Sequence, residues 1–411
     1  MTGPRRQLGL LVAAPGFRLL FLATLSSSLG TLLATVALVV DVKDRTNSGP
    51  WVSALMLVEF LPAVVVGLFF GPLLDRFSRR GLMVASDLVR FLVFCLLPFA
   101  GSAGAIVALA GIAGFATGFF RPAVYAGLPN LVEERDLGRA NSLIQTGENV
   151  SWTIAPVIGG ILVAAWGPEP AYWVNAASFL VSALLLLRIP GRHLQGAIAA
   201  SRGHLRDLRE GMAYVVRTRP LLTVLVVWTI ALGAVASTQT AQIFLAKDAF
   251  DAGDLGYGLM FGSIGLGLAI GSFQAGTWVE RRSIGTVYAA SILLQALGVA
   301  GAAVAPNVWA SLPCFVLAGI GNGTAVVCNS LLVQRGAPDH LRGRVFTVIM
   351  SVNYAVYGIG FVIAGPLTDS VGPRWVFGGV AVVLALSSLV AYALTRGAER
   401  TVEQPAGAEA A

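Results

Sequence analysis

Twelve apolar stretches follow one another along this chain, and each is long enough to cross a bilayer as a helix. A transmembrane helix needs about 20 predominantly apolar residues. Inside a bilayer the backbone must satisfy its own hydrogen bonds, so a helix is the expected conformation of each stretch. The pattern predicts an all-α polytopic membrane protein with spans at about 17–40, 51–74, 81–100, 105–128, 140–166, 171–188, 221–246, 255–278, 284–304, 308–334, 344–370 and 375–395.

The composition agrees with this class. Hydrophobic residues make up 56% of the 411 residues, charged residues only 12%, and the mean hydropathy is +0.77. A net charge of +7 could suggest a nucleic-acid partner, but the arginines lie in short loops between the apolar stretches. We therefore expect no nucleic acid as a partner, and the bilayer itself as the surroundings of the chain.

The residues that serve enzymes and metal sites are sparse and scattered. Cys95, Cys314 and Cys328 all lie in apolar stretches, which predicts neither disulfides nor a metal site. The three histidines fall in predicted loops, and no phosphate-binding loop with its lysine is present. We expect no cofactor, no metal, no enzymatic activity and no transport driven by ATP from this chain alone.

The two halves of the chain repeat each other at a shift of 205 residues. Gly71 matches Gly276 (276 − 71 = 205), and Gly167-Pro168 matches Gly372-Pro373. The same shift aligns Gly114 with Gly319, Gly118 with Gly323, Gly138 with Gly343, Gly160 with Gly365, and Asp75-Arg76 with Glu280-Arg281. The repeat predicts two six-helix bundles, residues 1–189 and 220–398, joined by a cytoplasmic linker at 190–219 and followed by a disordered tail at 399–411.

The linker contains a helical pattern of apolar residues. They are three or four positions apart, at Leu205, Leu208, Met212 and Val215, so part of the linker should form an amphipathic helix on the membrane surface. A solvated connection is the simpler interpretation, and a lipid-regulated or calmodulin-like segment is the alternative.

A charged turn between the second and third spans carries the first resemblance to a known family. It reads GPLLDRFSRR, and its Gly71, Leu73, Asp75, Arg76, Arg79 and Arg80 fit the G-x-L-x-D-R-x-G-R-R signature of the major facilitator superfamily, with Ser78 in place of a glycine. The resemblance implies a conformational latch that involves this turn and Arg121. Asp75 would then meet the start of the eleventh span, and Asp75→Asn should favour the inward-open state. The simpler alternative is that the arginines only anchor the topology.

A second motif lies in the fifth span. Ala155-Pro156-Val157-Ile158-Gly159-Gly160 resembles the G-P-x-x-G-G motif of the exporter branch of this superfamily. Proline removes a backbone hydrogen bond and glycines permit close helix contacts, so an ordinary kink is the alternative interpretation. The residues from Arg121 to Leu131 and from Arg139 to Ser142 are similar to bacterial macrolide-efflux and enterobactin-efflux proteins. The family implies a monomer of two bundles around a central cavity.

The distribution of basic residues predicts the orientation. One side of the membrane has Arg76, Arg79, Arg80, Arg135, Arg139, Arg281, Arg282, Arg335, Arg342 and Arg344, and the other has little beyond Lys43, Arg45, Lys247 and Arg374. By the positive-inside rule both termini face the cytoplasm of a bacterial inner membrane, and both lysines of the chain lie outside.

Ionisable residues inside the spans are few: Glu59, Asp87, Arg90, Arg121 and Glu148. Asp87 and Arg90 are three residues apart and can neutralise each other, which indicates a mainly structural pair. Glu59 and Glu148 have no opposite charge three or four residues away. Both are therefore proton-coupling candidates, with fixed structural acids as the alternative. We favour Glu148 because it shares a helix with Pro156, Gly159 and Gly160.

The pattern as a whole predicts a secondary transporter. We expect it to export an amphipathic small molecule, drug-like or siderophore-like, in exchange for protons by alternating access. Uptake or uniport of a small solute is one alternative. A membrane sensor on the same fold, without transport, is another.

Overall fold

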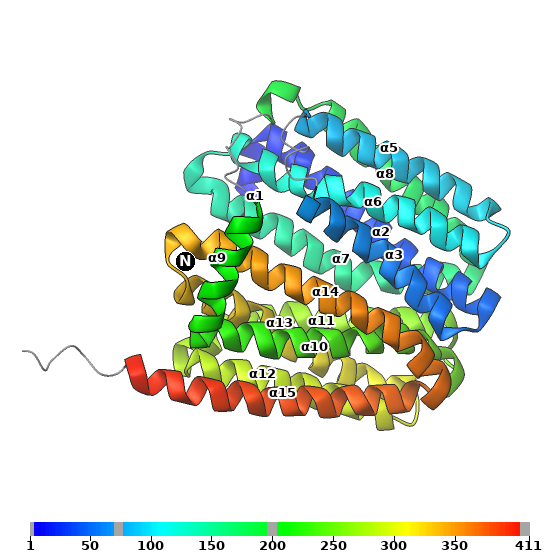
Figure 1. Cartoon of the computed structure of the whole chain (residues 1–411). Coiled ribbons are helices and arrows are strands. Elements are labelled where there is room, and N and C mark those ends of the chain that lie inside the picture. The colour runs from blue at the N-terminus through cyan, green and yellow to red at the C-terminus, as the bar shows by residue number, and fades with distance from the viewer. Residues whose placement is uncertain (1–3, 70–76, 195–203, 403–411) are drawn as a thin grey trace, which may run out of the picture. The chain divides into compact units, whose positions relative to one another are not determined.

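The computed structural model describes residues 4–69, 77–194 and 204–402, and all of its long elements are helices (Figure 1). Twelve of these helices are long and apolar enough to span a membrane, which confirms the predicted fold class. The helices from the N-terminus to the linker are α1 (Pro4–Ala13), α2 (Pro15–Thr46), α3 (Gly49–Phe69), α5 (Arg79–Leu96), α6 (Ala103–Gly127), α7 (Leu137–Trp166) and α8 (Glu169–Leu187).

The remaining helices begin at the linker. They are α9 (His204–Arg217), α10 (Arg219–Phe244), α11 (Gly253–Arg281), α12 (Ile284–Val304), α13 (Val308–Gly336), α14 (Asp339–Val371) and α15 (Pro373–Val402). One π-helical turn, Leu245–Ala249, continues α10, and 3-10 turns cover Leu97–Phe99, Leu128–Asn130, Glu134–Asp136 and Gly191–His193.

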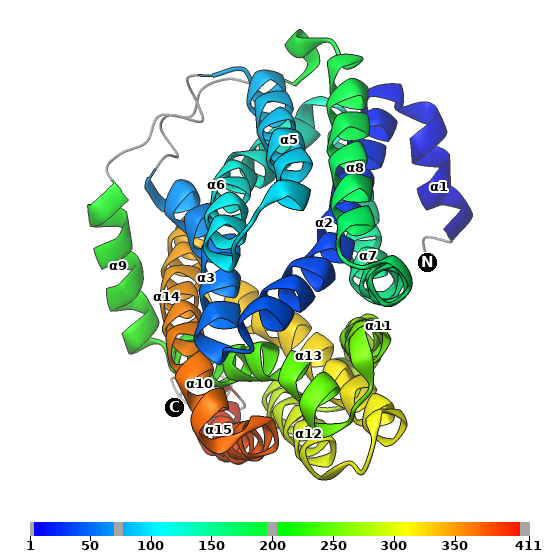
Figure 2. The ribbon, with the colours of Figure 1, turned by 90° about the vertical axis from the view of Figure 1, so that its right-hand side faces the viewer.

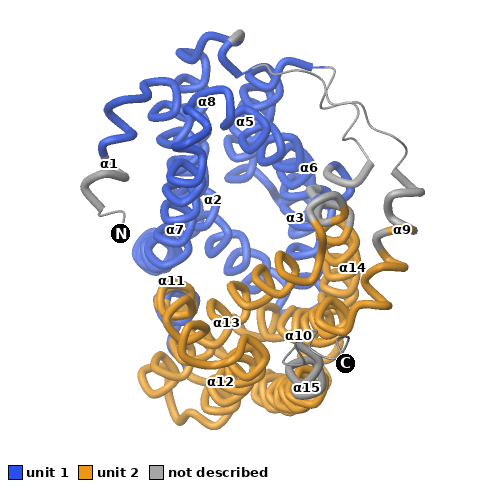
Figure 3. Tube along the Cα trace, turned by 90° about the vertical axis from the view of Figure 1, so that its left-hand side faces the viewer, with its two compact units in different colours: residues 1–200, 251–262 blue, residues 201–250, 263–411 orange. Residues whose placement is uncertain are grey.

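The chain forms two compact units (Figure 3). The first unit comprises residues 1–200 together with 251–262, so it includes the start of α11. The second unit comprises residues 201–250 and 263–411.

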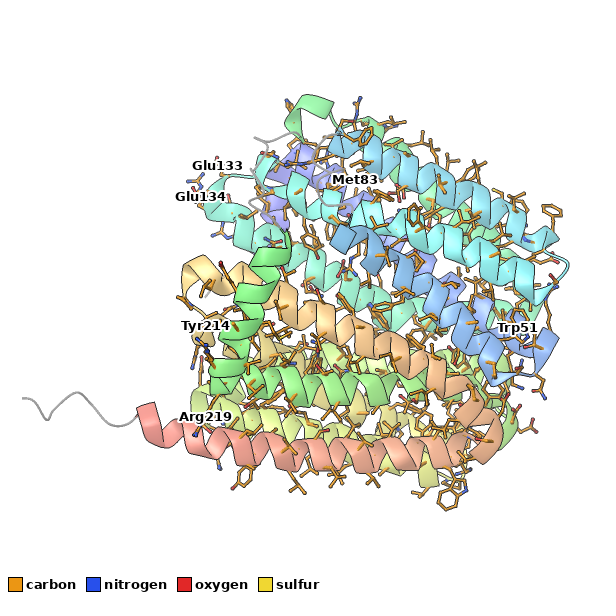
Figure 4. The ribbon with its side chains drawn as sticks, viewed as in Figure 1. Trp51, Met83, Glu133, Glu134, Tyr214 and Arg219 are labelled. Carbon is orange, nitrogen blue, oxygen red and sulfur yellow. The ribbon has the colours of Figure 1, made fainter. Side chains whose placement is uncertain are left out.

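In the first unit, α2 packs against α7 and α8, α5 against α6 and α8, and α3 against α6 (Figure 2). A cluster of buried apolar side chains, which includes Phe17, Met83, Phe120 and Leu186, joins α2, α5, α6 and α8. Trp51, at the start of α3, lies at the opposite end of this unit from Glu133 and Glu134 in Figure 4.

In the second unit, α12 packs against α13 and α15, and α10 against α14 and α15. The linker helix α9 packs along α14. Its Val215 is fully buried, and the Tyr214 hydroxyl donates to the Gly336 carbonyl at 3.3 Å (Figure 4). The predicted amphipathic helix is therefore present, and its Met212 and Val215 pack with apolar residues of α10, α13 and α14.

The local signals that start and stop the helices recur at the 205-residue shift. The Ser78 hydroxyl accepts from the Gly81 amide at the start of α5, and Ser283 accepts from the equivalent Thr286 at the start of α12. Asparagine and serine side chains are good N-caps because their oxygens satisfy exposed helix amides. Two further matched pairs are Ser102 with Asn307, both N-caps, and Gly167 (φ +80°) with Gly372 (φ +82°), both helix ends.

The boundaries differ from the sequence prediction in a few places. The apolar lead-in before the first span forms a separate short helix, α1, and α14 begins at Asp339, five residues before the expected start. Helix α15 runs to Val402, so its last turn covers the beginning of the segment that we expected to be a disordered tail. Gly71, Asp75 and Arg76 lie outside the described residues.

Candidate transport site

Glu148 on α7 forms an ion pair with Arg121 on α6. Its two carboxylate oxygens accept from Arg121 Nη2 at 3.0 and 3.1 Å. The Glu148 side chain is 17% exposed and that of Arg121 is 61% exposed, so the acid is the more enclosed partner. Sequence spacing could not find this pair because the two residues are 27 positions apart on different helices.

The surroundings of this pair are both polar and apolar. Tyr125, one turn after Arg121 on α6, interacts electrostatically with Arg121 and Glu148. The gap between α2 and α7 beside Glu148 is lined by Phe21, Thr24, Leu25, Ser28, Ile144 and Gly147, and it is too narrow to admit a water molecule.

Glu59, the other proton-coupling candidate, lies on α3 and is partly buried. The helix that carries it is held close to α6, because a Cβ atom at Gly114 would lie 2.5 Å from the Val58 carbonyl oxygen. Glu59 interacts electrostatically with two buried tyrosines of the first unit, Tyr172 on α8 and Tyr257 at the start of α11. Its surroundings therefore differ from those of Glu148, which faces an arginine.

Asp87 and Arg90 form the ion pair that their spacing predicted. Arg90 Nη2 lies 2.6 Å from Asp87 Oδ1, and both side chains are buried. The guanidinium also lies over the rings of Phe120 and Phe179, 4.6 and 4.3 Å from their centroids, and donates to the Ser27 hydroxyl. These contacts join α2, α5, α6 and α8, so the pair belongs to the interior of the first unit.

The two glycines of the motif in α7 make close contacts with different helices. A Cβ atom at Gly159 would lie 2.5 Å from the Leu33 carbonyl oxygen of α2. A Cβ atom at Gly160 would lie 3.0 Å from both the Asp254 carbonyl oxygen and the Gly258 Cα atom, at the start of α11. Pro156 contributes to the second contact, because a Cβ atom at Gly258 would lie 2.6 Å from its carbonyl oxygen.

Two of the arginines expected in the latch bind backbone carbonyls of the first unit. Arg79 Nη1 donates to Ala126 at 2.8 Å and to Leu194 at 3.0 Å, and Arg80 Nη1 donates to Ile189 at 3.1 Å. These bonds tie the start of α5 to the end of α6 and to the segment after α8. Gly71, Leu73, Asp75 and Arg76 of the charged turn lie outside the described residues, so the latch remains a prediction.

One buried acid near the end of α2, Asp41, was not among the residues expected from the sequence to matter. Its side chain accepts from the Tyr172 hydroxyl at 2.9 Å and from Arg45 Nε at 2.5 Å. Asp41 comes just after the predicted end of the first span, at about residue 40. The four-residue spacing from Arg45 was the available signal. In the part of the chain that the structure describes, no three His, Cys, Asp or Glu side chains gather as metal ligands.

The helices, the paired charges inside them and the repeat define a membrane transporter of two six-helix halves. The model of the Major Facilitator Superfamily matches residues 20–355 and 237–411, and the chain belongs to this superfamily. It is thus a transporter and not an enzyme, and it is a multi-pass protein of the bacterial inner membrane that handles small molecules.

Its relatives include bacterial drug exporters. The chain is 29% identical to the multidrug efflux pump Tap of Mycolicibacterium fortuitum over 397 residues, which covers 92% of this chain and 95% of Tap. It is 22% identical to macrolide efflux protein A of Streptococcus pyogenes, with 84% and 87% of the two chains covered. The fold is similar to that of the peptide transporter POT, with a TM-score of 0.76, 13% identity and coverage of 94% and 95%.

Proposed function

We propose that this protein exports amphipathic small molecules from the cell in exchange for protons. The observation that carries the proposal is the ion pair between Glu148 and Arg121, which joins two membrane-spanning helices of a chain that resembles drug exporters over most of its length. Charged groups inside membrane helices are costly and commonly mark ion or substrate pathways.

The pair supplies a way to couple a proton to a conformational change. When Glu148 is ionised, it holds the Arg121 guanidinium. A proton on the carboxylate removes the charge that Arg121 binds and frees the arginine for another partner. A transporter with two conformations shifts toward the one that better accommodates the new charge state. Proton entry from outside and substrate exit would then alternate.

The repeat supports a proton site in the first half of the chain. The position equivalent to Glu148 is Asn353 in α14, whose Oδ1 accepts from the Thr229 hydroxyl at 2.7 Å. An amide at this position can hold a neighbouring helix but cannot take up a proton. The asymmetry supports Glu148 as the proton carrier, and the protein is proposed to work as a monomer.

The proposal is tested with everted membrane vesicles that are energised to acidify their interior. A fluorescent amphipathic cation such as ethidium should accumulate in vesicles with the wild-type protein, and a protonophore should abolish the gradient. Glu148→Gln should build no gradient but should still exchange labelled for unlabelled ethidium. The matched control is Glu134→Gln, which neutralises an exposed acid in the preceding loop.

Three results would contradict parts of this proposal. A full, protonophore-sensitive gradient with Glu148→Gln would exclude Glu148 as the carrier and leave Glu59 to be tested by Glu59→Gln. A gradient of the opposite sign would indicate uptake. If the wild type neither accumulates nor exchanges any of a panel of amphipathic compounds, the result would indicate a protein that does not transport.

A further inference from the structure

In the second unit, an arginine caps the end of α12. Arg374, at the start of α15, donates through Nη1 to the carbonyls of Ala303 and Ala305 at 2.9 and 2.7 Å. Its guanidinium also lies 5.0 Å from the ring centroid of Phe250, just after α10. The carbonyls at a helix end lack partners within the helix, so this arginine satisfies them. In this unit an arginine and an aromatic ring are thus sufficient to cap the carbonyls at the end of α12.

The first unit caps the equivalent place with a different arginine. Arg45, at the end of α2, donates through Nη1 to the Ala100 carbonyl at 3.0 Å. Ala100 is the repeat equivalent of Ala305, whereas Arg45 is equivalent to Phe250 and Glu169 to Arg374. The capping arginine therefore occupies different positions in the two halves, whereas the carbonyls that it caps are equivalent.

Only the first of these two caps includes an acid. Asp41 is 6% exposed, pairs with Arg45 and accepts from Tyr172, which is itself 1% exposed. Its repeat equivalent is Ala246, a fully buried alanine. The second unit shows that the same carbonyl is capped without a carboxylate. The cap alone therefore does not account for Asp41, whose burial in a membrane helix is costly.

We infer that Asp41 is a second proton-handling residue of this transporter, at the end of the first unit that is expected to face outside. The inference rests on the proposed proton exchange. A proton from the outer solution binds an oxygen of the Asp41 carboxylate, which removes the ion pair with Arg45, and the same proton leaves when the pair forms again. The Arg45 side chain is 37% exposed and so provides contact with the outer solution.

The groups around Asp41 connect it to a proton candidate already described. On its own helix are Arg45, the buried Lys43 and the exposed Asp44. On α8, Tyr172 binds Asp41 directly, and Glu169 interacts electrostatically with Arg45. On α3, Glu59 interacts electrostatically with Tyr172. A change of charge at Asp41 therefore reaches Glu59 through one tyrosine, while the pair of Glu148 and Arg121 is separate.

The test transplants the acid-free cap of the second unit into the first. The triple variant Asp41→Ala, Arg45→Phe and Glu169→Arg keeps an arginine and an aromatic ring beside the Ala100 carbonyl but removes the carboxylate. Asp41→Asn removes only the negative charge, and Tyr172→Phe removes only the hydroxyl that donates to Asp41. The control is Asp44→Asn, which neutralises an exposed acid three residues away. Ethidium export is measured in proteoliposomes with the pH set separately on the two sides, after the amount and thermal stability of each variant have been measured.

The wild type and Asp44→Asn should export faster as the outer side is acidified. The triple variant and Asp41→Asn should lose this dependence on outer pH, retain ethidium exchange, and melt within a few degrees of the wild type. A stable triple variant with the wild-type pH profile would overturn the inference and leave Asp41 as a structural acid. If even the wild type shows no response to the proton gradient, the proposed proton exchange itself has failed.

Discussion

At the scale of single residues, Arg90 carries a charge into the interior of the first unit. The Asp87 carboxylate neutralises this charge, and the guanidinium lies over the rings of Phe120 and Phe179. These three groups replace water around the guanidinium, and each of them attracts a cation. A cation over an aromatic ring contributes about 2 kcal/mol or more when desolvated. The cluster depends on each member, because any unpaired charge left in this interior is costly.

This dependence predicts a non-additive effect on stability. Arg90→Leu leaves the Asp87 carboxylate buried without its cation and should lower the free energy of unfolding by about 3–5 kcal/mol. The double variant Asp87→Leu and Arg90→Leu removes both charges and should recover most of that loss. Thermal unfolding of the purified proteins in detergent measures both. A double variant less stable than Arg90→Leu would show that the pair is more than a neutralised charge.

At the scale of elements, α7 combines most of the features that we assign to transport. Glu148 faces α6, Gly159 faces α2, and Gly160 faces the start of α11. Two turns separate the acid from Pro156, so the proposed proton site and the close contacts belong to one helix. Small residues let helix backbones approach closely in a membrane, where van der Waals contact drives association.

A methyl group added at Gly159 should therefore clash with backbone atoms of α2. Gly159→Ala places Cβ against the Leu33 carbonyl, and the required shift should cost about 1–3 kcal/mol. Gly138→Ala in the same helix meets nothing within 4 Å and should be neutral or stabilise the protein by up to about 1 kcal/mol. Thermal unfolding in detergent compares the two variants. Equal stability would mean that α2 and α7 can move apart freely.

At the scale of the whole molecule, the orientation in the membrane can be measured with the two lysines. Both are expected outside, but they differ in accessibility. Lys43 is only 5% exposed and its ammonium donates to the Asn47 side chain, whereas Lys247 is partly exposed. Burial therefore protects Lys43, and an amine reagent should reach the two lysines at different rates.

An impermeant amine reagent applied to intact cells should label Lys247 readily and Lys43 slowly. Lys247→Arg should remove most of the label, while Lys43→Arg should leave it unchanged. The N-terminal amine should react only after the cells are opened. Peptide mass spectrometry locates the modified residues. If Lys247 is labelled only after lysis, the orientation is the opposite of the predicted one and both termini lie outside.

Much of the architecture follows from the sequence because its causes are local. A bilayer requires that each apolar stretch satisfy its own backbone hydrogen bonds, so hydropathy alone locates the helices within a few residues. Caps are equally local: Ser78, Ser102 and Gly167 act on amides and carbonyls within one turn. The spacing of Asp87 and Arg90 also predicts their ion pair, because three residues bring two side chains to one helix face.

Tertiary structure decides which distant groups meet. Arg121 pairs with Glu148 on the next helix, and Asp41 is enclosed by Tyr172, 131 residues away in the sequence. Neither contact has a local pattern, since each depends on how α2, α6, α7 and α8 pack. The burial of Lys43 has the same origin. The sequence therefore determines the spans, the repeat and the caps, whereas the packing of the helices determines which charges are buried, paired and available to a proton.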